Sequence, residues 1–302
     1  MWFFYFLFMD KKRSLKIILH LCLLIFILEG CSRFKAPLFK KLSIDSTNID
    51  FINSIKESDT FNILTNEYIF NGGGVAVADF DNNDLPDLFF TGNQVSNRLY
   101  LNQGNLKFRD VTSQANLINP ERWSTGIAVG DVNADGWMDV YVCAAMNEGK
   151  RSNMLYINQG LTVNGIPKFL NQAQEYGLAD ISNSMAASFL DYNKDGLMDL
   201  FVVNNEQNEM LPTNYRKKII DGSAASTDRL FKNNGDGTFT DVSKVSGILI
   251  EGFGLSVSIS DFNNDSWPDI YITNDYLTND ILYINQQDGS FENLISNYTP
   301  CQ

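Results

Sequence analysis

A nine-residue pattern recurs four times in this chain and constrains the fold more than any other feature. Its copies cover residues 79–87, 131–139, 191–199 and 261–269, at intervals of 52, 60 and 70 residues. Each copy carries aspartate or asparagine at positions 1, 3, 5 and 9. Self-similarity at such a period is typical of β-propellers and stacked arrays, where each repeat is one structural unit. The pattern therefore predicts a repeat protein.

Each copy lies between two expected strands. Small residues alternate with larger ones before the copies, at 75–78, 127–130, 186–189 and 255–260, which is the period of a strand. Nearly continuous apolar runs follow, at 88–90, 140–142, 200–203 and 270–272, and indicate strands covered on both faces. Hairpins rich in Asn, Asp and Gly close the units, at 99–111, 155–169, 230–242 and 282–291. We predict an all-β propeller with four four-stranded blades, and a further strand within 61–70 that leads into the first blade.

The repeated loops have the donor pattern of a calcium site. Oxygen-bearing side chains at positions 1, 3, 5 and 9 and a backbone carbonyl at position 7 suit Ca²⁺, which takes six to eight oxygens in flexible geometry. We therefore expect up to four Ca²⁺ ions. The expected ligands are Asp79, Asp81, Asn83, Leu85 and Asp87; Asp131, Asn133, Asp135, Trp137 and Asp139; Asp191, Asn193, Asp195, Leu197 and Asp199; and Asp261, Asn263, Asp265, Trp267 and Asp269. A single such loop is equally compatible with a plain Asx turn. We expect the metal to be structural, because the ligands leave no evident open position for chemistry.

Two further positions refine this interpretation. Position 6 must turn sharply, and it is glycine only in the second and third loops, which we expect to bind most strongly; the fourth loop, with Ser266, is expected to be weakest. An EF-hand needs an acidic residue at position 12 and flanking helices. Position 12 is apolar in every copy, so the EF-hand and dockerin-type interpretations fail.

The N-terminus predicts export. A basic stretch, an apolar run from Ile17 to Leu28 and the lipobox-like end at Cys31 indicate a lipoprotein signal peptide at 1–30. We expect a lipid on Cys31, a tether at 31–60 and blades over 61–302. The protein would then be exported and anchored at the outer membrane or periplasmic face, with membrane contact only through that lipid. An uncleaved signal anchor is the alternative.

Composition excludes several classes of function. His20 is the only histidine and lies in the signal segment, so the mature chain cannot run a Ser-His-Asp triad or bind zinc through imidazole. Removing residues 1–30 leaves 19 Lys+Arg and 34 Asp+Glu, a charge that disfavours nucleic acid. Cys143 lies in an apolar run, and we interpret it as a small buried hydrophobe.

These motifs resemble the FG-GAP or VCBS repeat propellers, in particular the cartilage acidic protein type often joined to an ASPIC/UnbV domain. The resemblance covers residues 61–302 and includes Asn71 to Gly74, the four loops and the hairpins at 155–160 and 235–242. It implies a seven-bladed, calcium-binding, exported propeller that is often lipid-anchored in bacteria. The four blades here would then be part of a propeller truncated at its C-terminus. The chain departs from the family pattern where position 6 is not glycine.

We therefore expect a calcium-binding extracytoplasmic module for adhesion or ligand binding, without enzymatic activity. Its partner would be an unknown extracellular protein or glycan, contacted through the insertions at 146–153 and 204–228 unless these are merely solvated loops. One alternative is a polysaccharide lyase-like enzyme, for which Glu121, Arg122, Glu148 or the cluster around Arg216 could supply catalytic groups. Another is a structural spacer for a missing C-terminal domain.

Overall fold

The computed structural model describes residues 37–119, 122–146, 150–206, 216–275 and 278–298. The signal segment and Cys31 lie outside these residues. The chain divides into two compact units, residues 1–43 and 44–302, and all the described strands belong to the second. Among the described residues, no helix combines the length and apolar character needed to cross a membrane.

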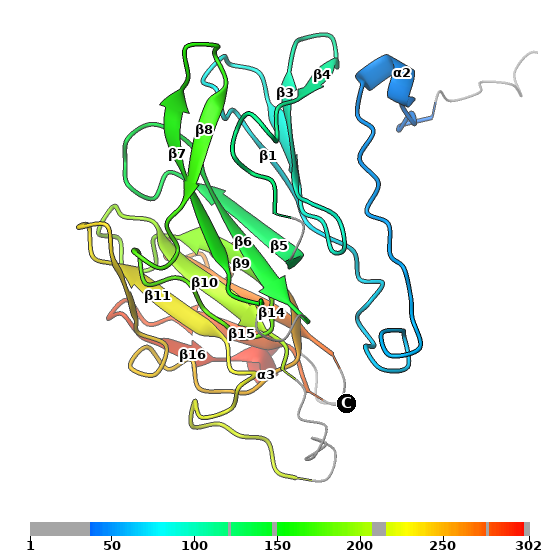
Figure 1. The fold of residues 1–302 in the computed structure, drawn as a ribbon. Helices are drawn as coiled ribbons and strands as arrows, with labels where there is room; N and C mark the ends of the chain where they lie inside the picture. The colour runs from blue at the N-terminus through cyan, green and yellow to red at the C-terminus, as the bar shows by residue number, and fades with distance from the viewer. Residues whose placement is uncertain (1–36, 120–121, 147–149, 207–215, 276–277, 299–302) are drawn as a thin grey trace, which may run out of the picture. The chain divides into compact units, whose positions relative to one another are not determined.

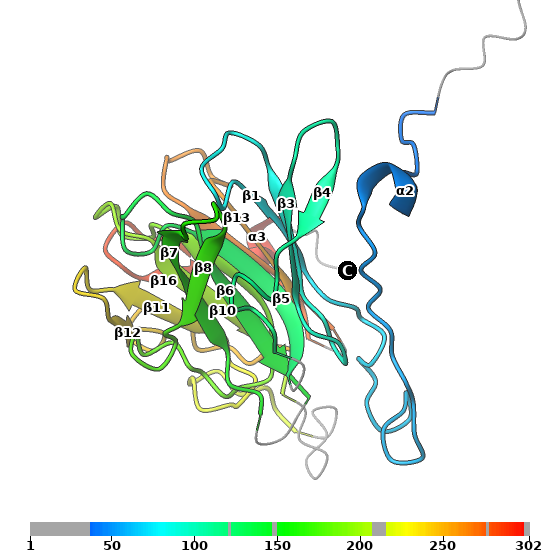
Figure 2. The ribbon, with the colours of Figure 1, turned by 45° about the horizontal axis from the view of Figure 1, so that its top comes forward.

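Four antiparallel sheets, each of four strands in chain order, form the second unit (Figure 1). The sheets consist of β1 (Val75–Ala78), β2 (Asp87–Phe90), β3 (Arg98–Asn102) and β4 (Phe108–Asp110); β5 (Trp123–Gly130), β6 (Asp139–Ala145), β7 (Met154–Leu161) and β8 (Pro167–Asn171); β9 (Ser184–Leu190), β10 (Asp199–Asn204), β11 (Arg229–Asn233) and β12 (Phe239–Asp241); and β13 (Gly254–Ser260), β14 (Asp269–Asn274), β15 (Ile281–Asn285) and β16 (Phe291–Asn293). Two one-turn helices, α2 (Ile44–Thr47) and α3 (Ile295–Tyr298), flank them. The first strands of consecutive sheets lie beside one another, β1 by β5, β5 by β9 and β9 by β13. Figure 2 shows β1, β5 and β13 from a second side. This all-β architecture, one four-stranded sheet per repeat, is that of β-propeller blades, as predicted.

A separate hydrophobic core lies between each pair of consecutive sheets. Phe89 meets Val140 in the first core, and Leu155 and Leu200 share the second. A third core joins the third and fourth sheets in the same way. Side chains on both faces of β6 and β10 are buried, which explains why those strands are apolar without alternation. Burial alternates along β2 and is partial in β14, so the predicted cover on both faces is incomplete for these two strands. Cys143 is fully buried in the second core, as expected, and burial raises the pKa of its thiol.

An asparagine of the third strand links the second, third and fourth sheets each to the sheet before. In the second, third and fourth sheets its Nδ2 donates to the carbonyl oxygen of loop position 2 in the sheet before. These bonds are Asn158 to Phe80 at 3.0 Å, Asn233 to Val132 at 3.0 Å and Asn285 to Tyr192 at 2.8 Å. The equivalent Asn102 donates within its own sheet, to the carbonyl of Pro86 at 2.8 Å. The loops are therefore tied to the interfaces between sheets.

The segment before β1 is not a strand, and that prediction is wrong. Residues 59–71 form successive turns, because the side chain of Asn62 accepts the N–H of Leu64 at 2.9 Å and its carbonyl accepts that of Asn66 at 2.8 Å. Within this stretch, Ile69 is fully buried in a cluster with Trp123 and Met185 at the starts of β5 and β9. The segment thus covers one end of the first strands.

Residues nearer the N-terminus also contact the first sheet. Phe51 stacks on Phe90 with ring centroids 5.2 Å apart, and the hydroxyl of Tyr100 donates to Asp50 at 2.7 Å. These contacts lie within the stretch assigned to a tether. The division into tether and blades stays a prediction.

Candidate metal sites

All four nonamers form the same loop between the first and second strands of a sheet. In the second loop, Asp131 accepts the N–H of Asp135 at 3.1 Å and that of Gly136 at 2.8 Å. Asp135 Oδ1 accepts the N–H of Trp137 at 2.9 Å, which leaves its Oδ2 turned to the amide of Asn133, also at 2.9 Å. The third and fourth loops repeat these bonds; the first has Asp81 and Asn83 exchanged at positions 3 and 5. The loops therefore bring the predicted side-chain ligands together.

The aspartate at position 9 has a second role that the sequence did not reveal. It begins the second strand and is fully buried in every repeat. Asp139 accepts the N–H of Val132 through Oδ2 at 3.0 Å and that of Asn158 through Oδ1 at 2.8 Å. The same two bonds occur in the other repeats. Position 9 therefore holds the loop to the third strand of its sheet.

Left-handed backbone shapes each loop at two positions. Position 6 has positive φ in all four loops, from 65° at Asp84 and 70° at Ser266 to 88° at Gly136, so the sharp turn occurs even without glycine. Position 4 is also left-handed, with φ of 54° at Asn82 and 58° at Lys194. This second turn was not anticipated, because position 4 has no consistent residue type.

A cation fits the first loop on the chemistry of its donors. One ligand oxygen from each of Asp79, Asp81 and Asp87 lies within 4.8 Å of the others, and among the described residues this is the one such group of three carboxylates. Asp81 Oδ1 is buried without a hydrogen-bond partner there. Burial, with a smaller contribution from the charge of Asp79, raises the pKa of Asp81. A divalent cation would relieve both the repulsion and the desolvation.

The buried carboxyls at position 9 of the first, second and third loops also favour a bound cation. Burial raises the pKa of Asp87 to about 6, and of Asp139 and Asp199 to about 7, against the opposing effect of two backbone N–H donors. Neighbouring loop aspartates raise each of these pKa values further. A bound metal ion would therefore favour the ionised form of these loop carboxyls. Ligation by the carbonyl oxygens of Leu85, Trp137, Leu197 and Trp267 stays a prediction.

The residues considered for an enzyme do not converge in the described structure. Glu121 and Glu148 lie outside the described residues. Arg122 donates to the carbonyl of Ser152 at 2.6 Å, and Arg216 forms two bonds to the buried Glu251 at 2.7 and 2.8 Å. Both described arginines therefore hold loop segments to one another.

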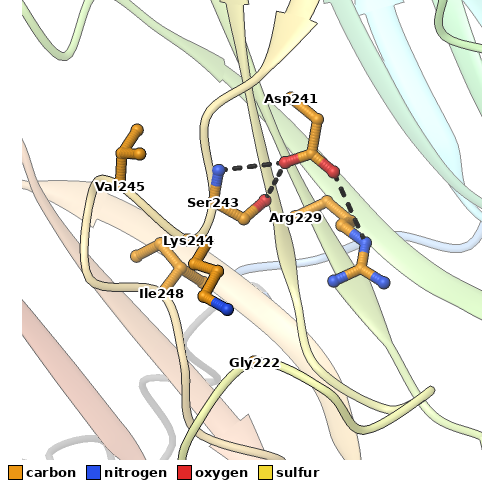
Figure 3. A pocket seen from close by; sticks show the side chains of 7 residues that line it. All are labelled: Gly222, Arg229, Asp241, Ser243, Lys244, Val245 and Ile248. Carbon is orange, nitrogen blue, oxygen red and sulfur yellow. Dashed lines mark hydrogen bonds and ion pairs between the residues drawn. The ribbon is translucent and has the colours of Figure 1, made fainter.

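A hollow of about 350 Å³ lies beside the third sheet, away from the loops (Figure 3). Arg229 and Asp241 form an ion pair of 3.8 Å on its wall, and Asp241 also accepts the N–H of Ser243 at 2.9 Å. The first sheet has the equivalent Arg98–Asp110 pair at 3.5 Å. The ion pair recurs between the third and fourth strands of another sheet, so it belongs to the structure of the blade and does not mark a ligand site. The hollow is therefore a secondary candidate for ligand contact.

Comparison with known proteins places the first, second and fourth loops, but not the third, in a described repeat. The model of the FG-GAP-like repeat family matches residues 79–142 and 219–272. Cartilage acidic protein 1 of mouse (Mus musculus) is 25% identical over 207 residues, and the human (Homo sapiens) protein is 23% identical over the same length. Each match covers 67% of this chain but only 28% of the relative. Repeats similar to FG-GAP thus make up the matched stretches of this propeller-like chain.

Proposed function

We propose that this chain is a calcium-binding extracytoplasmic module for adhesion or ligand binding, held to a membrane by a lipid on Cys31. FG-GAP repeats form a general ligand-binding or adhesion type of module, and the first-loop carboxylates within 4.8 Å of one another are the observation that carries the calcium proposal. Calcium would bridge the aspartates and fix each loop between its two strands. The partner would be an extracellular protein or a glycan, and no catalytic role is proposed.

Thermal melting with and without calcium tests this proposal. A cation that binds only the folded state adds RT ln(1+[L]/Kd) per site, which is about 2 kcal/mol at 5 mM Ca²⁺ for a Kd of about 10⁻⁴ M. For a domain of this size, we expect the melting temperature to rise by roughly 5 °C or more from chelator to 5 mM Ca²⁺. An unchanged melting temperature would contradict the calcium proposal.

Position 1 is the right place for a loop variant. Asp131 meets only N–H groups of its own loop, whereas Asp139 also holds the third strand, so D139N would disturb the fold without calcium. We expect D131N to reduce the calcium-induced shift and to lower the melting temperature in chelator only slightly, because it loses one of two hydrogen bonds inside an exposed loop. E292Q removes the same charge from an exposed position on β16 and should keep the full shift. For the anchor, C31S should move the protein from the membrane to the soluble fraction.

A further inference from the structure

The third loop carries a feature that distinguishes it from the other three. The ammonium of Lys232 lies 3.6 Å from Asp195 Oδ2. Asp195 Oδ1 already accepts the N–H of Leu197 at 3.0 Å, so Oδ2 is the oxygen that the backbone leaves for a cation. The lysine therefore contacts the position-5 oxygen that would ligate calcium.

No other repeat places an ammonium there among the described residues. Lys232 precedes Asn233 at the end of β11, and the equivalent residues are Leu101, Ile157 and Ile284. These three are 2%, 2% and 4% exposed and belong to the cores, whereas the Lys232 side chain is 40% exposed at the loop. In the fourth loop, the contact to Asp265 Oδ2 comes from the neutral amide of Gln287, at 3.1 Å.

A second lysine adds positive charge to the same loop. Lys194 occupies position 4, where the other loops have Asn82, Ala134 and Asn264. Its ammonium lies 4.5 Å from the ring centroid of Trp267 in the fourth loop, so it points along the row of loops and away from the third-loop ligands. Lys232 is thus the lysine that a bound cation would displace from the third loop. Lys194 acts on the fourth loop, where the N–H of Trp267 lowers the pKa of Asp265 and the charge of Lys194 helps to lower it further.

We propose that Lys232 is an affinity-determining residue of the third site, an internal cation that competes with calcium for Asp195. This inference rests on the proposed calcium function. The ammonium neutralises part of the negative charge of the loop when calcium is absent, and it must move before a divalent ion can bind there. The third loop therefore binds calcium less tightly than the second, even though both have glycine at position 6. This order differs from the ranking by glycine alone, which placed the third loop among the strongest.

The test needs a signal from the third loop alone. In the second loop Trp137 packs over Gly160, where an added Cβ would lie 3.2 Å from the Trp137 ring. Leu197 packs over Gly235 in the third loop in the same manner, at 3.1 Å from such a Cβ to Leu197 Cδ1. We therefore place a reporter at this site with L197W and replace Trp137 and Trp267 by phenylalanine. Trp123, buried at the start of β5, stays as a background signal, and the change of emission during calcium titration reports on the third loop. A parallel titration of the unmodified chain follows Trp137 and Trp267.

In the reporter chain we expect K232M to lower the Kd of the third loop about threefold to tenfold, the size expected for removing one partly exposed charge beside a divalent ion. K168M removes a lysine from the exposed face of β8 and controls for net charge. K232M should also melt slightly lower in chelator while showing a larger calcium-induced shift, which a general loss of stability would not produce.

The outcomes separate the two proposals. Equal Kd values for K232M and K168M, with calcium still binding, would overturn the role of Lys232 alone. Calcium that changes neither the emission of the unmodified chain nor its melting temperature would overturn the calcium function, and the competition with it. Tighter binding in K232M but not in K168M supports both.

Discussion

At the residue scale, a buried aspartate outside the loops shows what burial costs without a metal. Asp228 is fully buried just before β11 and accepts the N–H of Asn204 at 2.9 Å, while its Oδ2 has no partner among the described residues. The first two sheets have Asn97 and Asn153 at this place, and each accepts the same backbone N–H through Oδ1. The hydrogen bond therefore does not require a charge.

The variant D228N should stabilise the protein at neutral and alkaline pH. Burial raises the pKa of Asp228 to about 7, from 3.8. Because the folded-state pKa lies above the unfolded one, stability falls as the pH rises from about 4 to about 7, and the loss is complete above that. D228N removes this loss, and we expect a gain of about 1–2 kcal/mol at pH 8 and little at pH 4.

Urea unfolding at fixed calcium concentration between pH 4 and 8 measures this effect. D280N is the matched control, since Asp280 holds the same place in the fourth sheet but both its oxygens accept bonds, from Tyr271 at 2.6 Å and Asn274 at 2.9 Å. It should show no gain. A pH-independent difference between D228N and the parent chain would contradict the burial argument.

At the scale of elements, the sequence predicted what each repeat does within itself. The alternating first strands and the apolar second strands predicted the four sheets. The nonamer predicted the loop between the first and second strands of each sheet, such as that between β5 and β6. Contacts between repeats were not predictable, because Asn158 belongs to an ordinary hairpin motif and its partner, the carbonyl of Phe80, lies 78 residues away. Residues 61–70 were predicted as a strand because side chain-to-backbone bonds such as those of Asn62 leave no periodic signal.

The asparagine link gives a prediction with an internal control. Asn158 and Asn102 each accept the N–H of a following glycine and each donate to a carbonyl of their own sheet, at 3.4 and 2.8 Å, but only Asn158 also reaches the preceding sheet. We expect N158A to cost about 1–2 kcal/mol more than N102A, because it leaves the buried Phe80 carbonyl without that donor. Chemical denaturation of both variants in calcium checks this. Equal losses would mean that the bond between sheets adds nothing to stability.

At the scale of the whole molecule, each core is shared by two neighbouring sheets, so stability depends on every sheet having a cover on both faces. One face of the first sheet is covered by the second sheet, with which it shares the first core. Its aromatic residues Phe90 and Tyr100 meet the segment that contains Asp50 and Phe51 instead. This cover was not predicted from the sequence, because the segment is short and has no periodic pattern.

Adjacent residues of that segment test whether it acts as a cap. Phe51 stacks on Phe90 with an interplanar angle of 23°, whereas the neighbouring Ile52 is 73% exposed. We expect F51A to lower the free energy of unfolding by about 1–2 kcal/mol, because it removes an aromatic contact from the first sheet, and I52A to change it by less than about 0.5 kcal/mol. Urea unfolding of both variants in calcium provides the measurement. If F51A is as silent as I52A, the segment contributes no cover and behaves as the tether predicted for residues 31–60. A selective loss of stability in F51A would instead mean that the folded module begins near Ile44, where the second compact unit starts.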